Sequence, residues 1–215
     1  MTGAYSEIYV NDAQRNLGLA FDYAVNDCTV DIDLFAQLFA TSTAGELFGQ
    51  GDPRIISGMS GIELAREQLK RLSYLGMLPE PSYAFERSSE YWVGWLLAYY
   101  QWQSGMRFKD ILRAVHASWM REMYPIYHEG DISFAIDELD SHVALALPPS
   151  NLGTIRQRCG LSQTELAEAA GVNIRSIQMY EQGRNDINKA QAITLYRLAC
   201  ALGCTMEDLL ESPTQ

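Results

Sequence analysis

The sequence contains only three histidines and four cysteines, and no two cysteines form a CxxC pair. Neither a tetrahedral zinc site nor a disulfide scaffold is therefore indicated, and we expect reduced thiols and no cofactor or metal. No apolar run approaches the roughly 18 residues that a membrane helix needs. Polar and charged residues also occupy the N-terminal stretch, where a secretory leader would be apolar. We expect a cytoplasmic protein that makes no contact with a membrane.

Basic residues are scarce as well, because 16 Lys and Arg stand against 27 Asp and Glu, for a net charge of −11. A uniform charge of this sign would disfavour binding to phosphates. The charge is uneven, however: residues 1–149 hold 10 basic and 20 acidic groups, whereas residues 150–206 hold 6 basic and 4 acidic groups. Only the C-terminal part is therefore suited to nucleic acid.

With 215 residues, 47% of them hydrophobic and 20% charged, the chain can form one large folded domain or two modest ones. Two consecutive prolines, Pro148 and Pro149, remove two amide donors and disfavour a helix in the preceding residue. We therefore expect two domains: residues 1–147 as a helical domain for interaction, dimerisation or sensing, and residues 148–215 as a second domain.

Apolar residues before this joint recur every three to four positions, which predicts a helical bundle. We expect helices capped by Asn11, Asp31, Ser60, Ser88 and Asp131, a loop over 49–53, and one helix over 108–123 that ends at Pro125. Ser60 and Glu63 have capping-box spacing. The positions expected to face the core include Leu17, Phe21, Ala24, Cys28, Leu34, Phe35, Leu38, Phe39, Leu64, Ala65, Leu69, Ile111, Leu112, Val115, Trp119, Phe134, Ile136, Leu139 and Val143.

The residues after the joint have the pattern of two helices joined by a tight turn. Ser162 and Glu165 form a capping box before a helix over 166–170, Gly171 ends that helix, and Asn173 caps the next. Only a few residues then separate the two helices, which is the helix-turn-helix arrangement. Other helices are expected over 151–158, 174–182, 189–202 and 205–210, packed through Leu152, Ile155, Ile177, Ile193, Leu198, Ala199 and Leu202.

The stretches LSQTELAEAAGV, IQMYEQGR and LYRLACALGCTMEDLLE, within residues 151–211, resemble the helix-turn-helix domain of the lambda-repressor and Cro family, also called the XRE family. The resemblance implies an all-α protein in which a five-helix DNA-binding domain follows an N-terminal helical domain of uncharacterised type. Ala167 is small where two helices would cross, and Ile177 is the core residue of the recognition helix. Glu181 and Gly183 would close that helix.

The resemblance also implies which residues contact double-stranded DNA. Gln163 is similar to the glutamine with which the family binds phosphate, at the start of the first motif helix. The guanidinium of Arg175 can donate two hydrogen bonds to one guanine, whereas Ile174 and Met179 offer only apolar contacts, for example with a thymine methyl group. The predicted DNA-binding set is Gln163, Asn173, Ile174, Arg175, Ser176, Gln178, Met179, Arg184 and Lys189. Asn185 is a further candidate for a phosphate contact, and Arg156 and Arg158 for positions that flank the groove.

An aromatic stripe, Tyr91, Trp92, Trp95, Tyr99, Tyr100 and Trp102, follows helical spacing. Its default interpretation is core packing. The alternative is that part of it docks another protein or a second subunit, and this alternative fails if Trp92, Trp95 and Trp102 are all buried in their own domain.

Arg121 and His128 are separated by six residues, which is similar to the R-x4-6-H pair of HEPN ribonucleases. In that class, cationic groups stabilise phosphate and polarise a 2′-hydroxyl. Pro125 lies between the two residues, and no further catalytic residue accompanies them. A ribonuclease is therefore kept as a remote alternative, since short motifs of this kind arise by chance.

Taken together, the sequence predicts a non-enzymatic, sequence-specific DNA-binding regulator that acts as a dimeric repressor. The acidic N-terminal domain is expected to lie away from the duplex and to contact a protein partner. The alternative is an antitoxin that binds its toxin through this domain and represses the operon that encodes both. A toxic protein encoded beside it would distinguish the antitoxin from the repressor.

Overall fold

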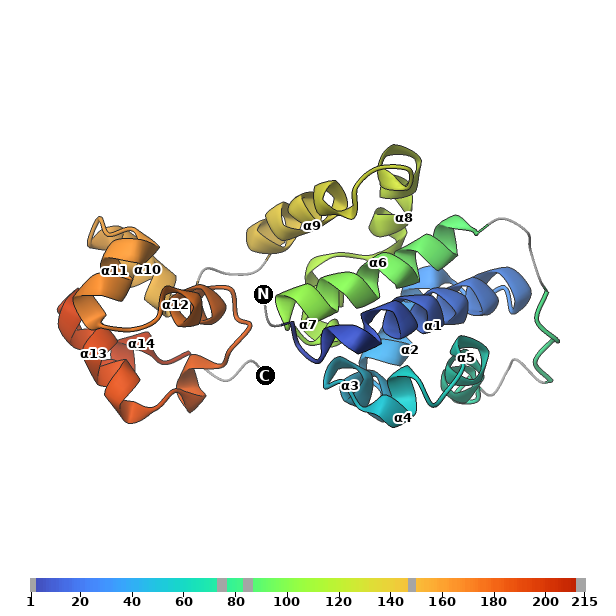
Figure 1. The fold of residues 1–215 in the computed structure, drawn as a ribbon, viewed down its shortest axis with the longest axis horizontal. Helices are drawn as coiled ribbons and strands as arrows, with labels where there is room; N and C mark the ends of the chain where they lie inside the picture. Colours follow the sequence, from blue (N-terminus) through green and yellow to red (C-terminus); the bar gives the residue numbers. More distant parts are fainter. Residues whose placement is uncertain (1–2, 73–76, 83–86, 147–149, 212–215) are drawn as a thin grey trace. The chain divides into compact units, whose positions relative to one another are not determined.

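The computed structural model describes residues 3–72, 77–82, 87–146 and 150–211. Within these ranges every regular element is helical and no strand occurs, which confirms the all-α prediction. The chain divides into two compact units, residues 1–146 and 147–215 (Figure 1). The predicted joint at Pro148 and Pro149 lies outside the described residues. Among the helices that are described, none is both long enough and apolar enough to cross a membrane.

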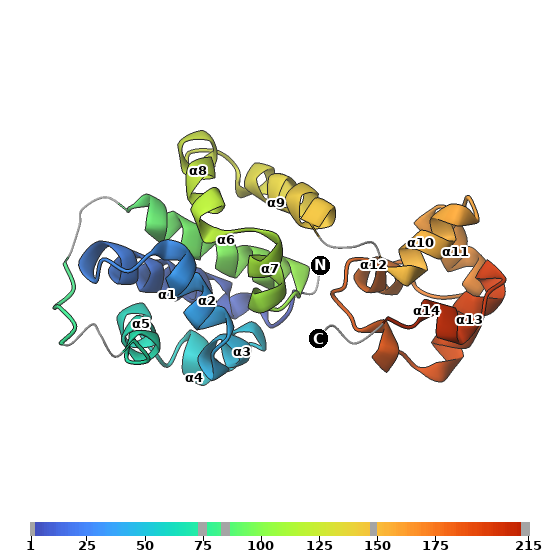
Figure 2. The same ribbon diagram turned by 180° about the vertical axis from the view of Figure 1, so that it is seen from behind.

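The N-terminal unit is a bundle of helices that can be followed from both sides (Figures 1 and 2). A short turn, η1 (Glu7–Tyr9), leads into α1, and a π-helical turn, η2 (Tyr23–Asp27), follows α1. The helices are α1 (Val10–Asp22), α2 (Ile32–Ala40), α3 (Thr43–Gly49), α4 (Pro53–Ile56), α5 (Gly61–Leu69), α6 (Ser89–Ser104), α7 (Phe108–Ala114), α8 (Ala117–Tyr127) and α9 (Ile132–Ala146).

Helix α1 lies at the centre of this unit because α5 and α6 approach its backbone closely. A Cβ atom on Gly94 of α6 would lie 2.4 Å from the carbonyl oxygen of Leu17, and one on Gly61 of α5 would lie 2.2 Å from that of Asn16. The buried Asn16 side chain donates hydrogen bonds to the carbonyls of Ile56 (2.6 Å) and Met59 (3.1 Å). Since a buried amide needs such partners, Asn16 ties α1 to the chain between α4 and α5.

Most of the predicted caps are present. Asp31 accepts from the amides of α2, Ser60 and Glu63 form the capping box of α5, and Ser88 caps α6. Asp131 accepts from the Ser133 amide at the start of α9. The prediction for Asn11 is wrong: Asn11 lies inside α1, because the turn η1 carries the chain directly into the helix one residue earlier.

The single helix predicted over 108–123 is two helices, and Pro125 does not end the second. The backbone of Val115 is extended (φ −136°, ψ 122°), so α7 ends before it and α8 starts two residues later. The Asp33 carboxylate of α2 accepts from the Ser118 amide at 3.0 Å, which satisfies an amide at the start of α8. Pro125 lies inside α8 near its C-terminal end.

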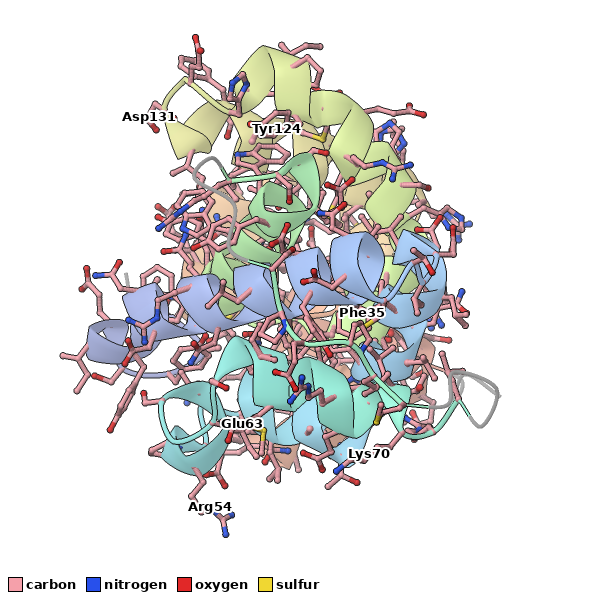
Figure 3. The ribbon with its side chains drawn as sticks, turned by 90° about the vertical axis from the view of Figure 1, so that its right-hand side faces the viewer. Phe35, Arg54, Glu63, Lys70, Tyr124 and Asp131 are labelled. Atoms are coloured by element: carbon pink, nitrogen blue, oxygen red, sulfur yellow. The ribbon has the colours of Figure 1, made fainter. Side chains whose placement is uncertain are left out.

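Aromatic side chains fill much of the interior. Phe21 and Phe35 meet edge to face with centroids 5.0 Å apart, and Figure 3 shows Phe35 inside the bundle. In the predicted aromatic stripe, Trp92 and Trp102 are buried, whereas Trp95 is half-buried. The stripe therefore mainly forms core, and the condition that would have excluded a docking role is not met. The prediction that Phe134 faces the core is wrong, because this residue is exposed.

The C-terminal unit has the predicted run of short helices. They are α10 (Asn151–Arg158), α11 (Gln163–Ala170), α12 (Ile174–Glu181), α13 (Ala192–Leu202) and α14 (Met206–Leu209), with a short turn η3 (Ile187–Lys189) before α13. The core is formed by Leu152, Leu166, Ala170, Ile177, Ile187, Leu195, Leu198, Ala199, Leu202 and Leu209. The prediction that Ile193 packs inward is wrong. The residues of α13 that face the core are Leu195, Leu198, Ala199 and Leu202, which recur every three to four positions, and Ile193 lies outside this spacing.

Candidate nucleic-acid interface

The turn between α11 and α12 is built by the residues that the sequence indicated. The Ser162 hydroxyl accepts from the Glu165 amide at 3.1 Å, and the Glu165 carboxylate accepts from the Ser162 amide at 2.7 Å, so α11 begins at a complete capping box. Gly171 ends α11 with φ +62°, and no atom lies within 4 Å of the position that a Cβ would take. Glycine is therefore favoured here by the left-handed backbone conformation and not by a lack of space. Two residues later Asn173 caps α12 by accepting from the Arg175 amide at 2.8 Å.

Helix α12 is oriented by one fully buried residue, Ile177, which has no exposed surface. Its outward surface carries the predicted base-contacting residues. Ile174 is 38% exposed, Arg175 is exposed, and the others are half-buried: Ser176, Gln178 and Met179. The helix therefore presents polar and apolar groups together on the side away from its own core.

A buried ion pair anchors the end of α12 to α10. The Arg156 guanidinium donates to both carboxylate oxygens of Glu181, from Nε at 2.6 Å and from Nη2 at 2.9 Å, and the two side chains are only 11% and 9% exposed. Nη1 of Arg156 donates to the carbonyl of Leu161 at 2.6 Å. Hydrogen bonding to Glu181 raises the pKa of Arg156. The planar guanidinium thus holds three segments of the domain together.

Gln163 joins the same group. Its Nε2 donates to Oε2 of Glu181 at 2.8 Å, so the predicted phosphate-binding glutamine is held at the first residue of α11 by the end of α12. A side chain that is already oriented loses less conformational freedom when it binds.

The suggestion that Arg156 flanks the groove is therefore wrong, because its guanidinium is buried and committed to Glu181. The sequence indicates only a helix-closing role for Glu181 and does not predict this pair. A signal was present, since Arg156 lies one helical turn after the core residue Leu152. A charge on the core face of an amphipathic helix predicts a buried partner of opposite sign.

The remaining predicted cations follow α12. Arg184 is half-buried and its amide donates to the carbonyl of Met179 at 2.8 Å, so its position is fixed relative to α12. Lys189 is 84% exposed and lies 3.4 Å from Asp186, a surface pair that contributes little. Asn185 and Arg158 are exposed.

The two residues of the ribonuclease alternative, Arg121 and His128, each have another partner in the N-terminal unit. Nη1 of Arg121 lies 3.4 Å from the Glu90 carboxylate, and Nδ1 of His128 lies 2.7 Å from the carbonyl of Tyr124. Both groups therefore have structural partners on α6 or α8. Among the described residues, no group of three His, Cys, Asp or Glu side chains is placed to hold a metal ion.

Comparison with known families agrees with this geometry. A family model described as Helix-turn-helix matches residues 152–209, which are almost the residues on which the resemblance rests. No curated protein and no solved structure matches the chain. The match leaves the N-terminal unit unassigned. Residues 152–209 are therefore a helix-turn-helix domain of the XRE type, and this match supports a DNA-binding regulator of that type.

Proposed function

We propose that this protein is a transcriptional repressor that binds duplex DNA sequence-specifically, as a homodimer, through the outward surface of α12. The orientation of α12 is the observation that carries the proposal. Ile177 is wholly buried and Glu181 is paired with Arg156, while the predicted base-contacting residues of α12 keep part of their surface exposed. A rigid helix of this kind fits the major groove.

The outward residues divide into two roles. Arg175 reads guanine, while Ile174 and Met179 contact thymine methyl groups, and Ser176 and Gln178 add hydrogen bonds to base edges. Phosphates are bound by Gln163, Asn173, Arg184 and Lys189. Since only one cation reaches the bases, DNA shape supplies part of the selectivity.

Dimerisation follows from the size of the recognition surface. One short recognition helix contacts only a few base pairs. Two such domains related by a two-fold axis contact two half-sites that are one turn of the DNA helix, roughly 34 Å, apart. The expected operator is therefore a palindrome. Light scattering of the protein with and without its selected site measures the stoichiometry, and a 1:1 complex on a non-palindromic site would refute the dimer.

Site selection from a random duplex library, followed by mobility shifts at two salt concentrations, tests the function. Arg175→Ala should cost about 1–3 kcal/mol and relax one base position, whereas Arg184→Ala should weaken binding to all sequences alike. Arg197→Ala is the matched control, because Arg197 is exposed on α13 and is outside the predicted set. The same selected sequence with Arg175→Ala as with wild type would remove Arg175 as the reader.

An antitoxin is a second candidate, supported by the charge of the N-terminal unit. Residues 1–149 carry 10 of the net 11 negative charges, which suits a cationic protein partner and not DNA. Expression of the neighbouring genes with and without this protein tests the role. An antitoxin rescues growth from a toxic neighbour, and the absence of any toxic neighbour would exclude it.

A further inference from the structure

We propose that the N-terminal unit binds an arginine side chain of a partner protein in a cavity between the N-terminal segment, α6 and α9. The proposal concerns this unit alone and does not depend on DNA binding. The cavity has a volume of about 390 Å³, within the range of ligand pockets. Its chemically distinctive lining residues are Glu7, Tyr99, Trp102, Asp131, Ile136 and Asp137.

The wall of the cavity is aromatic on the α6 side. Tyr99 and Trp102 lie one turn apart, with ring centroids 5.5 Å apart and planes tilted by 50°. Trp102 is held in place because its indole N–H donates to the carbonyl of Tyr5 at 2.9 Å. Tyr99 is only half-buried, so part of this residue is accessible to a ligand. Aromatic faces attract cations, and arginine stacks on them more often than lysine does.

The rim of the cavity is acidic. Glu7 belongs to η1, whereas Asp131 precedes α9 and Asp137 lies within it, and each of the three is exposed. Among the described residues, no lysine or arginine lines the cavity and no ion pair neutralises these three carboxylates. Asp131 also accepts from the Ser133 amide at 2.8 Å, which fixes its orientation at the start of α9. The charge of this pocket is therefore complementary to a cation.

A second hollow in the same unit shows what sets this one apart. It lies beside α5, and its acidic residues Glu63, Glu67 and Glu80 are accompanied by Arg66 and Lys70. Figure 3 shows Glu63 and Lys70 on the opposite side of the unit from Asp131. Mixed charge without aromatic rings gives that hollow no preference for a cation.

Arginine fits the cavity because a guanidinium can stack on an aromatic ring and bind a carboxylate at the same time. Its flat face stacks on Tyr99 while its edge donates two hydrogen bonds to a carboxylate such as Asp137. The occupant is assigned to a protein because the whole N-terminal unit is acidic, so a basic protein surface is attracted over a wider area than the cavity itself.

The test uses the full-length protein with ¹⁵N-labelled tryptophan and three pentapeptides, Ac-Ala-Ala-X-Ala-Ala-amide, in which X is arginine, lysine or citrulline. Citrulline has nearly the shape of arginine without the charge. The arginine peptide should shift the indole signal of Trp102, identified by its loss in Trp102→Phe, more than the lysine peptide does. The citrulline peptide should not shift it. Equal shifts from arginine and citrulline would overturn the proposal.

Two variants locate the site. Asp137→Asn should lower the affinity for the arginine peptide about fivefold, which corresponds to the loss of one nearby opposite charge in water. Glu138→Gln should leave it unchanged, because Glu138 is exposed on the same helix and does not line the cavity. Equal binding by the two variants would overturn the assignment. Mobility shifts with operator DNA, expected to be the same for both variants, keep a failure here separate from a failure of DNA binding.

Discussion

Removing the charge of Glu181 should loosen the recognition helix without altering any residue that faces the DNA. In Glu181→Gln, the Arg156 guanidinium remains in a site where it is 11% exposed but has lost its carboxylate. Breaking a fully buried pair costs about 3–5 kcal/mol. Because both side chains keep about a tenth of their surface exposed, we place the cost near the low end, about 3 kcal/mol, or roughly a hundredfold in the local opening equilibrium.

Native-state hydrogen exchange of the full-length protein measures this change. The amide of Gln182, which donates to the carbonyl of Gln178 at 3.0 Å, reports the last turn of α12. Protection there should fall in Glu181→Gln and stay unchanged in Glu168→Gln, an exposed control on α11. Protection within about 0.5 kcal/mol of wild type would refute the anchoring role, since changes of that size are usual for surface substitutions.

A double variant distinguishes the loss of the attraction between Arg156 and Glu181 from the cost of leaving the Arg156 charge buried without a partner. Replacing both Arg156 and Glu181 by leucine leaves no ion buried, so protection of α12 should recover most of the loss seen in Glu181→Gln. Affinity for DNA should nevertheless stay below wild type, because Nε2 of Gln163 loses its acceptor in the double variant. Full recovery of DNA affinity would show that Gln163 needs no such support.

Two further outcomes are expected. Gly94→Ala should destabilise the N-terminal unit by about 1–3 kcal/mol in urea unfolding, because its Cβ would lie 2.4 Å from the Leu17 carbonyl oxygen, and an unchanged midpoint would contradict the close approach of α1 and α6. Hydrogen bonding from the Ser162 amide and hydroxyl lowers the pKa of Glu165, so the cap of α11 stabilises the fold above the ordinary glutamate pKa of about 4.3 and loses this effect as the pH falls through the lowered pKa. Protection of α11 between pH 6 and pH 3 should therefore decline in wild type and in Glu168→Gln, whereas Glu165→Gln should show no such decline.

Local signals in the sequence were sufficient for most of the C-terminal unit. The capping box at Ser162 and the positive φ of Gly171 are each set by neighbours within a few residues, whereas the burial of Ile177 follows from the family resemblance. Such short-range rules can be applied directly to a sequence. The helix-turn-helix and the orientation of its second helix could therefore be predicted, whereas the partner of Arg156 lies 25 residues away at Glu181 and was missed.

The N-terminal unit shows where local rules fail. Residues 108–123 have a continuous helical pattern, but the helix is interrupted at Val115. A new helix can start there because Asp33, which lies 85 residues before Ser118, accepts a hydrogen bond from the Ser118 amide at the start of α8. Burial by itself would raise the pKa of Asp33, but hydrogen bonds from Ser118 and Ala117, together with the nearby His116, outweigh it and lower the pKa. A cap that arrives from a distant helix leaves no trace in the sequence around the break.

The way α12 is attached has a consequence for how binding preferences change over time. Ile177 and Glu181 hold the helix from below, and neither belongs to the group of side chains that faces outward. Substitutions at positions 174, 175, 178 and 179 can accumulate with little penalty to folding, because surface changes are usually tolerated. New operators can thus be acquired on an unchanged scaffold, and libraries randomised at those four positions are a direct route to altered regulators.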